Sequence, residues 1–380
     1  MKRAMVMTIG AVLAGLVLSA PVLAGSITQL TNNEMDDCAP KVSGGNVAWY
    51  GYEAAEDAEI YFYNGSTVEQ VTDDAKLNRY PEISGGNLAW VRSGGGDEIF
   101  FWDGAAVTRV TTNGYHDRQA QVSGSKVVWT GLTPAGYEIF LWDGASTQQL
   151  TSSATADLFP VISGDNVAWQ GYDGSDWEIY VYDGVTTQQV TSDAKENRYP
   201  EISGDNLAWV RTGGGDEIFF SDGVTVTRVT TNGVHDRQAQ VSGSNVVWTG
   251  IVSPTNYEVF LWDGVTTTQL STNASFDLNP RVSADYVVWQ GYDGADYEIY
   301  MYDGATVTQL TDNEYDDLYP EIDGLNIVWQ GYDGNDFEVF LYSDDGGGVE
   351  TRVVPAIPEP SGLALLLVGL GAGIVRRRRA

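Results

Sequence analysis

The chain has 380 residues, of which 43% are hydrophobic and 12% aromatic, enough apolar material for a large folded core. It carries 52 Asp and Glu against 20 Lys and Arg, a formal net charge of −32. So acidic a chain repels nucleic acid, and we expect no nucleic-acid partner. The single cysteine, Cys38, excludes an internal disulfide, so stability must come from packing.

Residues 1–24 are typical of a secretory signal peptide. Lys2 and Arg3 precede an apolar run over residues 4–18, and small residues before position 25 suit cleavage after Ala24. A membrane anchor is the alternative, but the run is shorter than the ~20 residues of a spanning helix. We therefore expect export across the inner membrane, with signal peptidase as a transient partner.

Internal repetition dominates the body of the chain. The segment Val-Ser-Gly-Gly-Asn-Val-Ala-Trp over residues 42–49 recurs with small changes, and its tryptophans lie 39 to 41 residues apart. They are Trp49, Trp90, Trp129, Trp169, Trp209, Trp248, Trp289 and Trp329. A period near 40 with several short strands is the length of a propeller blade. The sequence predicts an all-β fold, a single β-propeller of about eight four-stranded blades over residues 25–354, with each Trp packed between neighbouring blades.

The fourth repeat illustrates the expected strands. Residues 160–163, 166–172, 178–182 and 187–191 alternate β-branched or aromatic residues with polar ones. Asp183-Gly184 and its equivalents suit a type I′ turn between the third and fourth strands. Two segments compete to close the ring, since residues 27–31 resemble a fourth strand and so do residues 349–354. Closure by the N-terminal strand would lock the ring and remove an exposed edge.

Three motifs recur in the repeat: Ser-Gly-x-Asn-Val-x-Trp, then Glu-Ile-Tyr-x-Tyr-Asp-Gly, then Gln-Leu-Thr. Over residues 26–354 they resemble the TolB-type and surface-antigen propeller repeats. The resemblance implies the architecture and says little about activity, because such propellers mostly bind or scaffold.

The C-terminal residues 355–380 have three parts. Pro358, Glu359 and Pro360 precede an apolar stretch over residues 362–375, and four arginines follow. Since arginines stay on the cytoplasmic side, the body must lie outside. This order resembles the PEP-CTERM sorting tail of Gram-negative bacteria. The resemblance implies a hydrophobic sorting helix, transient membrane anchoring, recognition by an exosortase, and release or attachment at the cell surface of a bacterium that makes extracellular polysaccharide. A plain membrane anchor is the alternative.

Carboxylates gather in the loops on one face of the predicted ring. A four-stranded meander places each loop between the second and third strands beside the loop that enters the next first strand. A Glu follows the former loops: Glu59, Glu98, Glu138, Glu178, Glu217, Glu258, Glu298 and Glu338. An Asp or Asn lies in the latter: Asp37, Asn78, Asp117, Asp157, Asn197, Asp236, Asp277 and Asp317. We expect the Asp and Asn residues of the entering loops around the mouth of the central channel.

Three loops of this face have the form Asp-Gly-x-Asp-x-Glu. Their aspartates are Asp173 and Asp176, Asp293 and Asp296, and Asp333 and Asp336. One interpretation is turn chemistry, in which Asp bonds its own backbone two residues on. The other is calcium, a hard ion that takes clustered oxygens, although the spacing is not that of an EF-hand. We expect no other cofactor.

Arginines interrupt the acidity at the same face, near two tyrosines. The residues are Arg79, Arg118, Arg198, Arg237, Tyr80 and Tyr199. They either pair with adjacent carboxylates or bind an acidic sugar through guanidinium and aromatic groups.

The only histidines, His116 and His235, occupy equivalent positions of a duplicated block. The sequence has no Ser-His-Asp set, nucleophile elbow or zinc cluster, so it favours a binding module over an enzyme. The partner would be extracellular polysaccharide, a surface protein or cations, at the cell surface or in the matrix. A polysaccharide lyase or hydrolase with a histidine base beside Arg118 or Arg237 is the enzymatic alternative.

Overall fold

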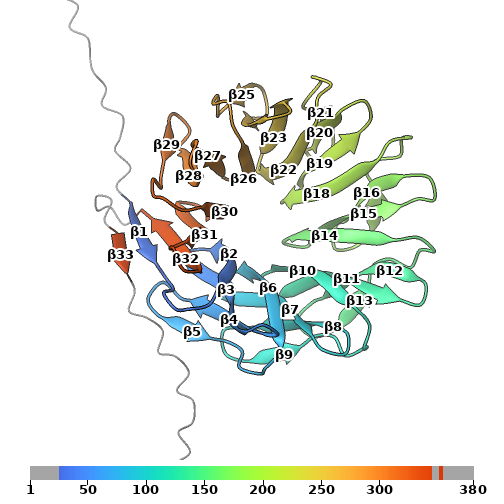
Figure 1. Ribbon diagram of the computed structural model, residues 1–380. Coiled ribbons are helices and arrows are strands. Elements are labelled where there is room, and N and C mark those ends of the chain that lie inside the picture. Colours follow the sequence, from blue (N-terminus) through green and yellow to red (C-terminus); the bar gives the residue numbers. More distant parts are fainter. Residues whose placement is uncertain (1–24, 345–350, 354–380) are drawn as a thin grey trace, which may run out of the picture.

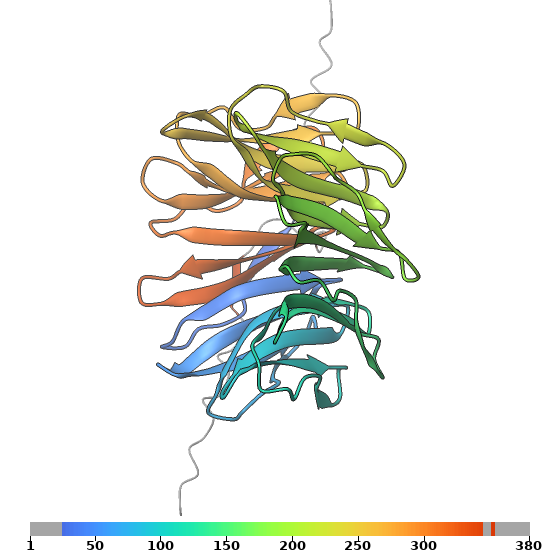
Figure 2. The ribbon, with the colours of Figure 1, turned by 90° about the vertical axis from the view of Figure 1, so that its right-hand side faces the viewer.

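The computed structural model describes residues 25–344 and 351–353, and all regular elements in these ranges are β-strands. Twisted sheets surround a central channel (Figure 1) and form one thick ring in side view (Figure 2). Within the described residues, no helix could cross a membrane. The predicted signal peptide, the Pro358-Glu359-Pro360 motif and the rest of the predicted tail lie outside these ranges.

Seven blades are antiparallel meanders of four consecutive strands, and the last sheet takes its outer strands from both ends of the described chain. The first strands line the channel (Figure 1). They are β2 (Asp37–Ser43), β6 (Leu77–Ser84), β10 (Asp117–Ser123), β14 (Asp157–Ser163), β18 (Asn197–Ser203), β22 (Asp236–Ser242), β26 (Asp277–Ser283) and β30 (Asp317–Asp323). The second strands are β3 (Asn46–Ala54), β7 (Asn87–Ser93), β11 (Lys126–Thr133), β15 (Asn166–Tyr172), β19 (Asn206–Thr212), β23 (Asn245–Ser253), β27 (Tyr286–Tyr292) and β31 (Asn326–Tyr332).

The outer half of each blade contains the third and fourth strands. The third strands are β4 (Asp57–Tyr63), β8 (Asp97–Trp102), β12 (Gly136–Trp142), β16 (Trp177–Tyr182), β20 (Asp216–Ser221), β24 (Asn256–Trp262), β28 (Tyr297–Tyr302) and β32 (Phe337–Ser343). The fourth strands are β5 (Val68–Gln70), β9 (Val107–Arg109), β13 (Thr147–Gln149), β17 (Thr187–Gln189), β21 (Val226–Arg228), β25 (Thr267–Gln269) and β29 (Val307–Gln309). The β2 and β6 blades join into one sheet through a single parallel pair, Ala58 with Leu77. The predicted all-β fold of four-stranded sheets is confirmed.

The two ends of the described chain meet in the last sheet. Strand β1 (Ser26–Gln29) pairs antiparallel with β32 and takes the place of its fourth strand. Strand β33 (Thr351–Val353) adds outside β1 in parallel, as a fifth strand. Leu30, which follows β1, is 1% exposed and packs with Trp49 of the first blade and Val328 of the last. The N-terminal strand therefore closes the ring.

A circle of hydrogen bonds links neighbouring blades on the face opposite the β1–β2 loop. At seven junctions, the side chain of the Ser that ends a first strand accepts a hydrogen bond from a backbone N–H group of the next blade. The pairs are Ser43 with Gly85, Ser84 with Gly124, Ser123 with Gly164, Ser163 with Gly204, Ser203 with Gly243, Ser242 with Ala284, and Ser283 with Gly324. At the closing junction, Asp323 Oδ2 accepts the N–H of Gly44 at 2.6 Å. A side chain at the end of a first strand thus bonds to the next blade at all eight junctions, and the acceptor is Asp at the closing junction and Ser at the others.

The repeated tryptophans form the core of each blade. All eight are at most 1% exposed. Each stacks on the cross-strand aromatic ring of the third strand, as Trp329 does on Phe340 with centroids 5.8 Å apart. The stacked rings fill the space between sheets, which gives large apolar burial per blade.

Two local features differ from the predicted strands. The turn between the third and fourth strands has positive φ only at its glycine (91° at Gly184), which excludes the predicted type I′, where both central residues need positive φ. The first strands also begin earlier than predicted, because each contains a bulge with a left-handed residue. These residues are Ala39, Tyr80, Gln119, Phe159, Tyr199, Gln238, Asn279 and Tyr319, with φ between 48° and 57°. A bulge of this kind changes the direction in which the side chain points.

Candidate functional site

The Asp or Asn that begins each first strand was predicted at the channel mouth, and this prediction is wrong. All but Asn78 stand at the first position of their strand, and all eight are 0 to 5% exposed. In six blades the side chain accepts a hydrogen bond from the indole Nε1 of its own blade, at 2.7 to 3.1 Å. A buried indole needs such an acceptor, so these residues serve the core.

The repeated glutamates are buried as well, at 0 to 6% exposed. Glu98 illustrates their bonding, since it accepts the hydroxyl of Thr111 at 2.7 Å and the N–H of Gly114 at 3.2 Å. The glutamates therefore fix the loop that enters the next first strand.

These buried carboxyls lie close to one another, which changes their acidity. Burial and the neighbouring Glu258 raise the pKa of Asp277 to about 6, and burial and Glu298 raise that of Asp317 to about 7. In two blades an Asn stands at this position and donates to the Glu instead, from Asn78 to Glu59 at 3.2 Å and from Asn197 to Glu178 at 3.0 Å. Substitution by Asn thus removes one of the two buried charges.

The channel interior holds a compact ion-pair network. Glu321 accepts from Lys41 at 2.7 Å and from Arg281 at 2.9 Å, across three different blades. Burial by itself raises the pKa of Glu321, but these two cations outweigh burial and lower the pKa to about 2. Glu201 makes no ion pair within the described residues, and burial raises its pKa to about 7.

A cavity of about 640 Å³ opens at the channel mouth between the β6, β10, β14 and β18 blades. Its wall contains four of the predicted binding residues, Arg79, Tyr80, Arg118 and Tyr199. Phe159, which sequence reasoning missed, contributes a further aromatic ring and packs edge-on against Tyr199 at 5.5 Å. The aromatic residues come from the left-handed bulges, which explains how three rings project into one opening. The strand pattern alone gave no signal for this position.

The remaining predicted binding residues lie outside the cavity wall. Arg198 pairs with Glu196 at 2.8 Å, and its guanidinium lies 6.0 Å from the Trp177 ring. His235 and Arg237 contact Asp216 at 2.8 and 3.4 Å. These contacts belong to the interpretation in which arginines pair with adjacent carboxylates.

The two guanidinium groups of the cavity are held differently. Arg118 donates to Asp97 at 2.9 Å, and His116 Nδ1 contacts the same carboxylate oxygen at 2.9 Å. Burial by itself raises the pKa of Asp97, but hydrogen bonds from His116 and Arg118 lower the pKa below its usual value. Arg79 has no ion pair within the described residues and lies 5.5 Å from the ring centroid of Tyr80. Arg79 is therefore the cation most available to a ligand.

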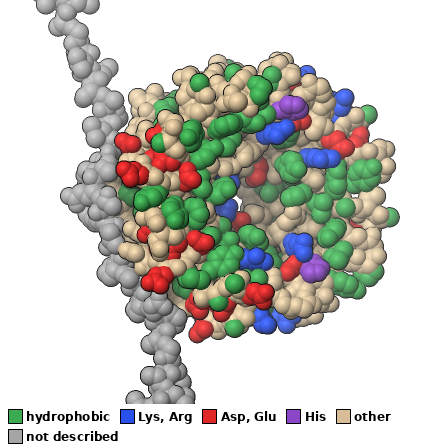
Figure 3. Space-filling model, viewed as in Figure 1, with side chains coloured by type: hydrophobic (Ala, Val, Ile, Leu, Met, Phe, Trp, Pro, Cys, Tyr) green, Lys and Arg blue, Asp and Glu red, His purple; other side chains and the backbone are tan. Residues whose placement is uncertain are grey.

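The face that carries the mouth is divided by charge. Basic and histidine side chains gather mainly on one side of the opening, and acidic side chains are densest on the other (Figure 3). The blades of β27 and β28 and of β31 and β32 lie on the acidic side (Figure 1), and their second-to-third-strand loops contain Asp293 and Asp296 and Asp333 and Asp336. Each of these pairs, and the pair Asp173 and Asp176, lies with the following Glu in one cluster of three carboxylates.

No protein-family model matches the sequence, and no curated protein matches it. Solved structures do match. The β-propeller domain of the Trilobed protease from Pyrococcus furiosus is 14% identical, with a TM-score of 0.55 over 74% of this chain and 99% of that domain. The computationally designed Ika8 protein is 15% identical, with a TM-score of 0.58 over 83% of this chain and 99% of that one.

Acylaminoacyl peptidase from Pyrococcus horikoshii is 14% identical, with a TM-score of 0.52, and the match covers 78% of this chain but only 57% of the peptidase. TolB from Acinetobacter baumannii also matches, at 20% identity over 59% of this chain and 65% of that one, but its TM-score of 0.38 is too low to carry an argument. At these identities the likeness shows the propeller fold alone. The Pyrococcus furiosus domain is described as having an open velcro topology, whereas β1 and β32 pair here.

Proposed function

We propose that this chain is an exported, closed propeller of eight blades that binds an acidic glycan at its channel mouth. The observation that carries the proposal is the cavity of about 640 Å³ that combines Arg79 and Arg118 with exposed aromatic rings. Guanidinium groups bind carboxylates through paired, charge-assisted hydrogen bonds. Aromatic faces suit the apolar faces of sugar rings, and the polar side chains of the wall, among them Gln119 and Gln121, can bond to sugar hydroxyl groups.

The charge of the protein adds selectivity to this proposal. A strongly acidic molecule repels polyanions in general, so an acidic glycan can approach only where cations are concentrated. The mouth offers such a place, because the basic side chains gather on one side of it (Figure 3). A neutral partner would form no ion pair with Arg79.

The ends of the chain support a location outside the cytoplasm. Residues 1–24 have the pattern of a signal peptide, and residues 355–380 resemble a sorting tail. In this proposal, signal peptidase removes the first segment and an exosortase recognises Pro358-Glu359-Pro360. The hydrophobic tail then anchors the protein transiently before it reaches the surface or matrix of a Gram-negative bacterium.

A glycan array probed with the purified protein, with and without calcium, tests the function. We expect retention on uronate-containing glycans and little retention on neutral ones. Binding to no glycan would contradict the proposal and favour a purely structural role.

The arrangement of His116, Asp97 and Arg118 favours one second candidate, a lyase or hydrolase of acidic polysaccharide. A histidine oriented by a carboxylate can act as a general base, and an adjacent arginine can neutralise the carboxylate of the substrate next to which the proton is abstracted. The same set recurs as His235, Asp216 and Arg237, at 2.8 and 3.4 Å. Unsaturated product from a uronate polymer, lost in the His116→Ala/His235→Ala double variant, would establish this activity; no product from the wild type would exclude it.

A further inference from the structure

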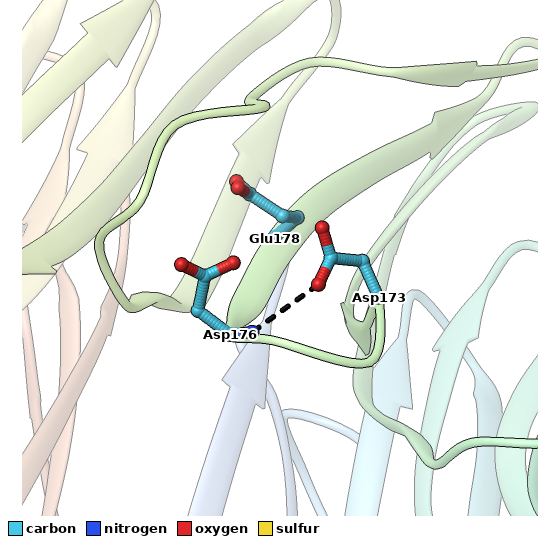
Figure 4. A group of neighbouring side chains, drawn as sticks. All are labelled: Asp173, Asp176 and Glu178. Carbon is cyan, nitrogen blue, oxygen red and sulfur yellow. Dashed lines mark hydrogen bonds between the residues drawn. The ribbon is translucent and has the colours of Figure 1, made fainter.

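Three loops on the face of the channel mouth each bring three carboxylates together. The clusters are Asp173, Asp176 and Glu178; Asp293, Asp296 and Glu298; and Asp333, Asp336 and Glu338. In each, one oxygen from every residue lies within 4.8 Å of the others. Figure 4 shows the first cluster, in which two carboxylates from the loop and one from the start of β16 surround a common space.

The negative charge of these clusters is not balanced by protein cations. Within the described residues, no Lys, Arg or His makes an ion pair with any of the nine carboxylates. The β6 and β18 blades differ, because there the loop lacks the Asp pair and the carboxylates of Asp97 and Asp216 contact an arginine and a histidine. The chain thus compensates loop charge in some blades and leaves it open in these three.

Buried oxygens without a donor provide a second, independent observation. Glu178 is 0% exposed, and although its Oε2 accepts from Thr191 and Asn197, its Oε1 has no hydrogen-bond partner. The same holds for one oxygen of each of four further residues: Asp296, Glu298, Asp336 and Glu338, all at most 8% exposed. A buried carboxylate oxygen without a partner is costly, on the order of 1–3 kcal/mol, and calls for a ligand.

Turn chemistry explains only part of each cluster. Asp173 Oδ1 accepts the N–H groups of Ser175 and Asp176 at 2.8 and 3.2 Å, which caps the turn. The side chains of the second Asp and of the Glu have no part in this cap.

We propose that each of the three clusters binds one Ca²⁺ ion. Ca²⁺ takes oxygen ligands at 2.3–2.6 Å, so two oxygens on one ion lie at most about 5.2 Å apart, which the clusters satisfy. The ligands are all oxygens, without Cys or His, which suits Ca²⁺ rather than Zn²⁺. Carbonyl oxygens and water would complete the coordination. Each ion would tie its loop to the third strand and neutralise the negative charge of its cluster.

Calorimetric titration with CaCl₂ of the full chain, from which bound metal has first been removed, tests this inference. We expect three Ca²⁺ per chain and a higher unfolding temperature with Ca²⁺ than with EDTA. Asp176→Asn, Asp296→Asn and Asp336→Asn should each remove one site, and the triple variant should bind none. The matched control is Asp183→Asn/Asp263→Asn/Asp303→Asn in the hairpin turns, where Asn64 already occupies the equivalent position; it should retain all three sites.

Terbium luminescence gives a second readout that does not depend on stability. Trp177 lies in sequence between Asp176 and Glu178, so it can sensitise Tb³⁺ bound at that cluster. We expect Ca²⁺ to displace this emission and Asp176→Asn to remove the part sensitised by Trp177, with unchanged circular dichroism. Emission through Tyr297, which lies in sequence between Asp296 and Glu298, should persist in this variant. Absence of Ca²⁺ binding at millimolar concentration, or a stoichiometry that the triple variant leaves unchanged, would overturn the inference.

Discussion

Asp317 accepts a hydrogen bond of 2.7 Å from the indole of Trp329, twelve residues later in the same blade. Both side chains are buried, so the pair satisfies the one polar atom of a large core residue. The facing position is Gly331, where an added Cβ would collide with the Asp317 carboxylate. In the two blades with Asn instead of Asp, the facing residue is an arginine, Arg92 or Arg211. Asp with Gly and Asn with Arg are therefore two versions of one packing unit.

Replacement of Asp317 by Ala should destabilise the protein, because it leaves the Trp329 N–H buried without an acceptor. We expect a loss of about 1–3 kcal/mol in the free energy of unfolding, measured in urea at pH 5. Asp317→Asn is the control, since Asn keeps the acceptor and occurs naturally at positions 78 and 197. Equal losses in both variants would show that the hydrogen bond contributes little.

Stability should fall as the pH rises from 5 to 8. The folded-state pKa of Asp117, Asp157, Asp236 and Asp277 is about 6, raised from 3.8 chiefly by burial. A raised pKa means that the folded state holds its proton more tightly, so the stabilisation is full below pH 3.8 and is lost as the pH rises through 6. Asp277→Asn should flatten the profile and raise stability at pH 8 by up to about 3 kcal/mol. A gain equal at pH 5 and pH 8 would contradict this assignment.

The two kinds of channel glutamate should respond oppositely to neutralisation. The lowered pKa of Glu321 means that its charge stabilises the fold above pH 4.5, so Glu321→Gln should cost on the order of 3 kcal/mol at pH 8. The pKa of Glu201 is raised to about 7, so Glu201→Gln should be neutral at pH 4 and stabilising at pH 8. Chemical unfolding at pH 4 and pH 8 distinguishes the two variants. If both change the free energy of unfolding in the same direction at pH 8, the proposed ion-pair network around Glu321 is wrong.

Ring closure depends on the segment that follows β1. Leu30→Ala should cost about 2–5 kcal/mol, because Leu30 is buried between the first and last blades. Val185→Ala is the control, as Val185 is 82% exposed in a hairpin turn, and it should have little effect. Equal unfolding temperatures of the two variants would contradict ring closure at this sheet.

Periodicity predicted the strands because propeller packing repeats every blade. The tryptophan spacing located the second strands, and residues 166–172 were predicted with the bounds of β15. The start of β14 was missed by three residues, since the left-handed bulge at Phe159 looks in sequence like a loop before proline. No periodic rule signals a left-handed aromatic residue.

The site could be predicted less well than the fold. Acidic residues of loops look alike in sequence. In the structure, however, Asp157 is buried and bonds to the indole of Trp169, whereas Asp173 is exposed in its loop. The arginines and tyrosines were identified by type, yet only the curvature of the ring decides which of them share a cavity. The ring therefore joins Arg79 with Arg118 and excludes Arg198.

Calorimetric titration of the full chain with a uronate oligosaccharide tests the binding proposal most directly. The account predicts saturable binding by the wild type, at least tenfold weaker binding by Arg79→Ala/Arg118→Ala, about 1.4 kcal/mol, and unchanged binding by the control Arg198→Ala/Arg237→Ala. Binding that survives the loss of Arg79 and Arg118, or no binding of an acidic oligosaccharide by the wild type, would contradict it.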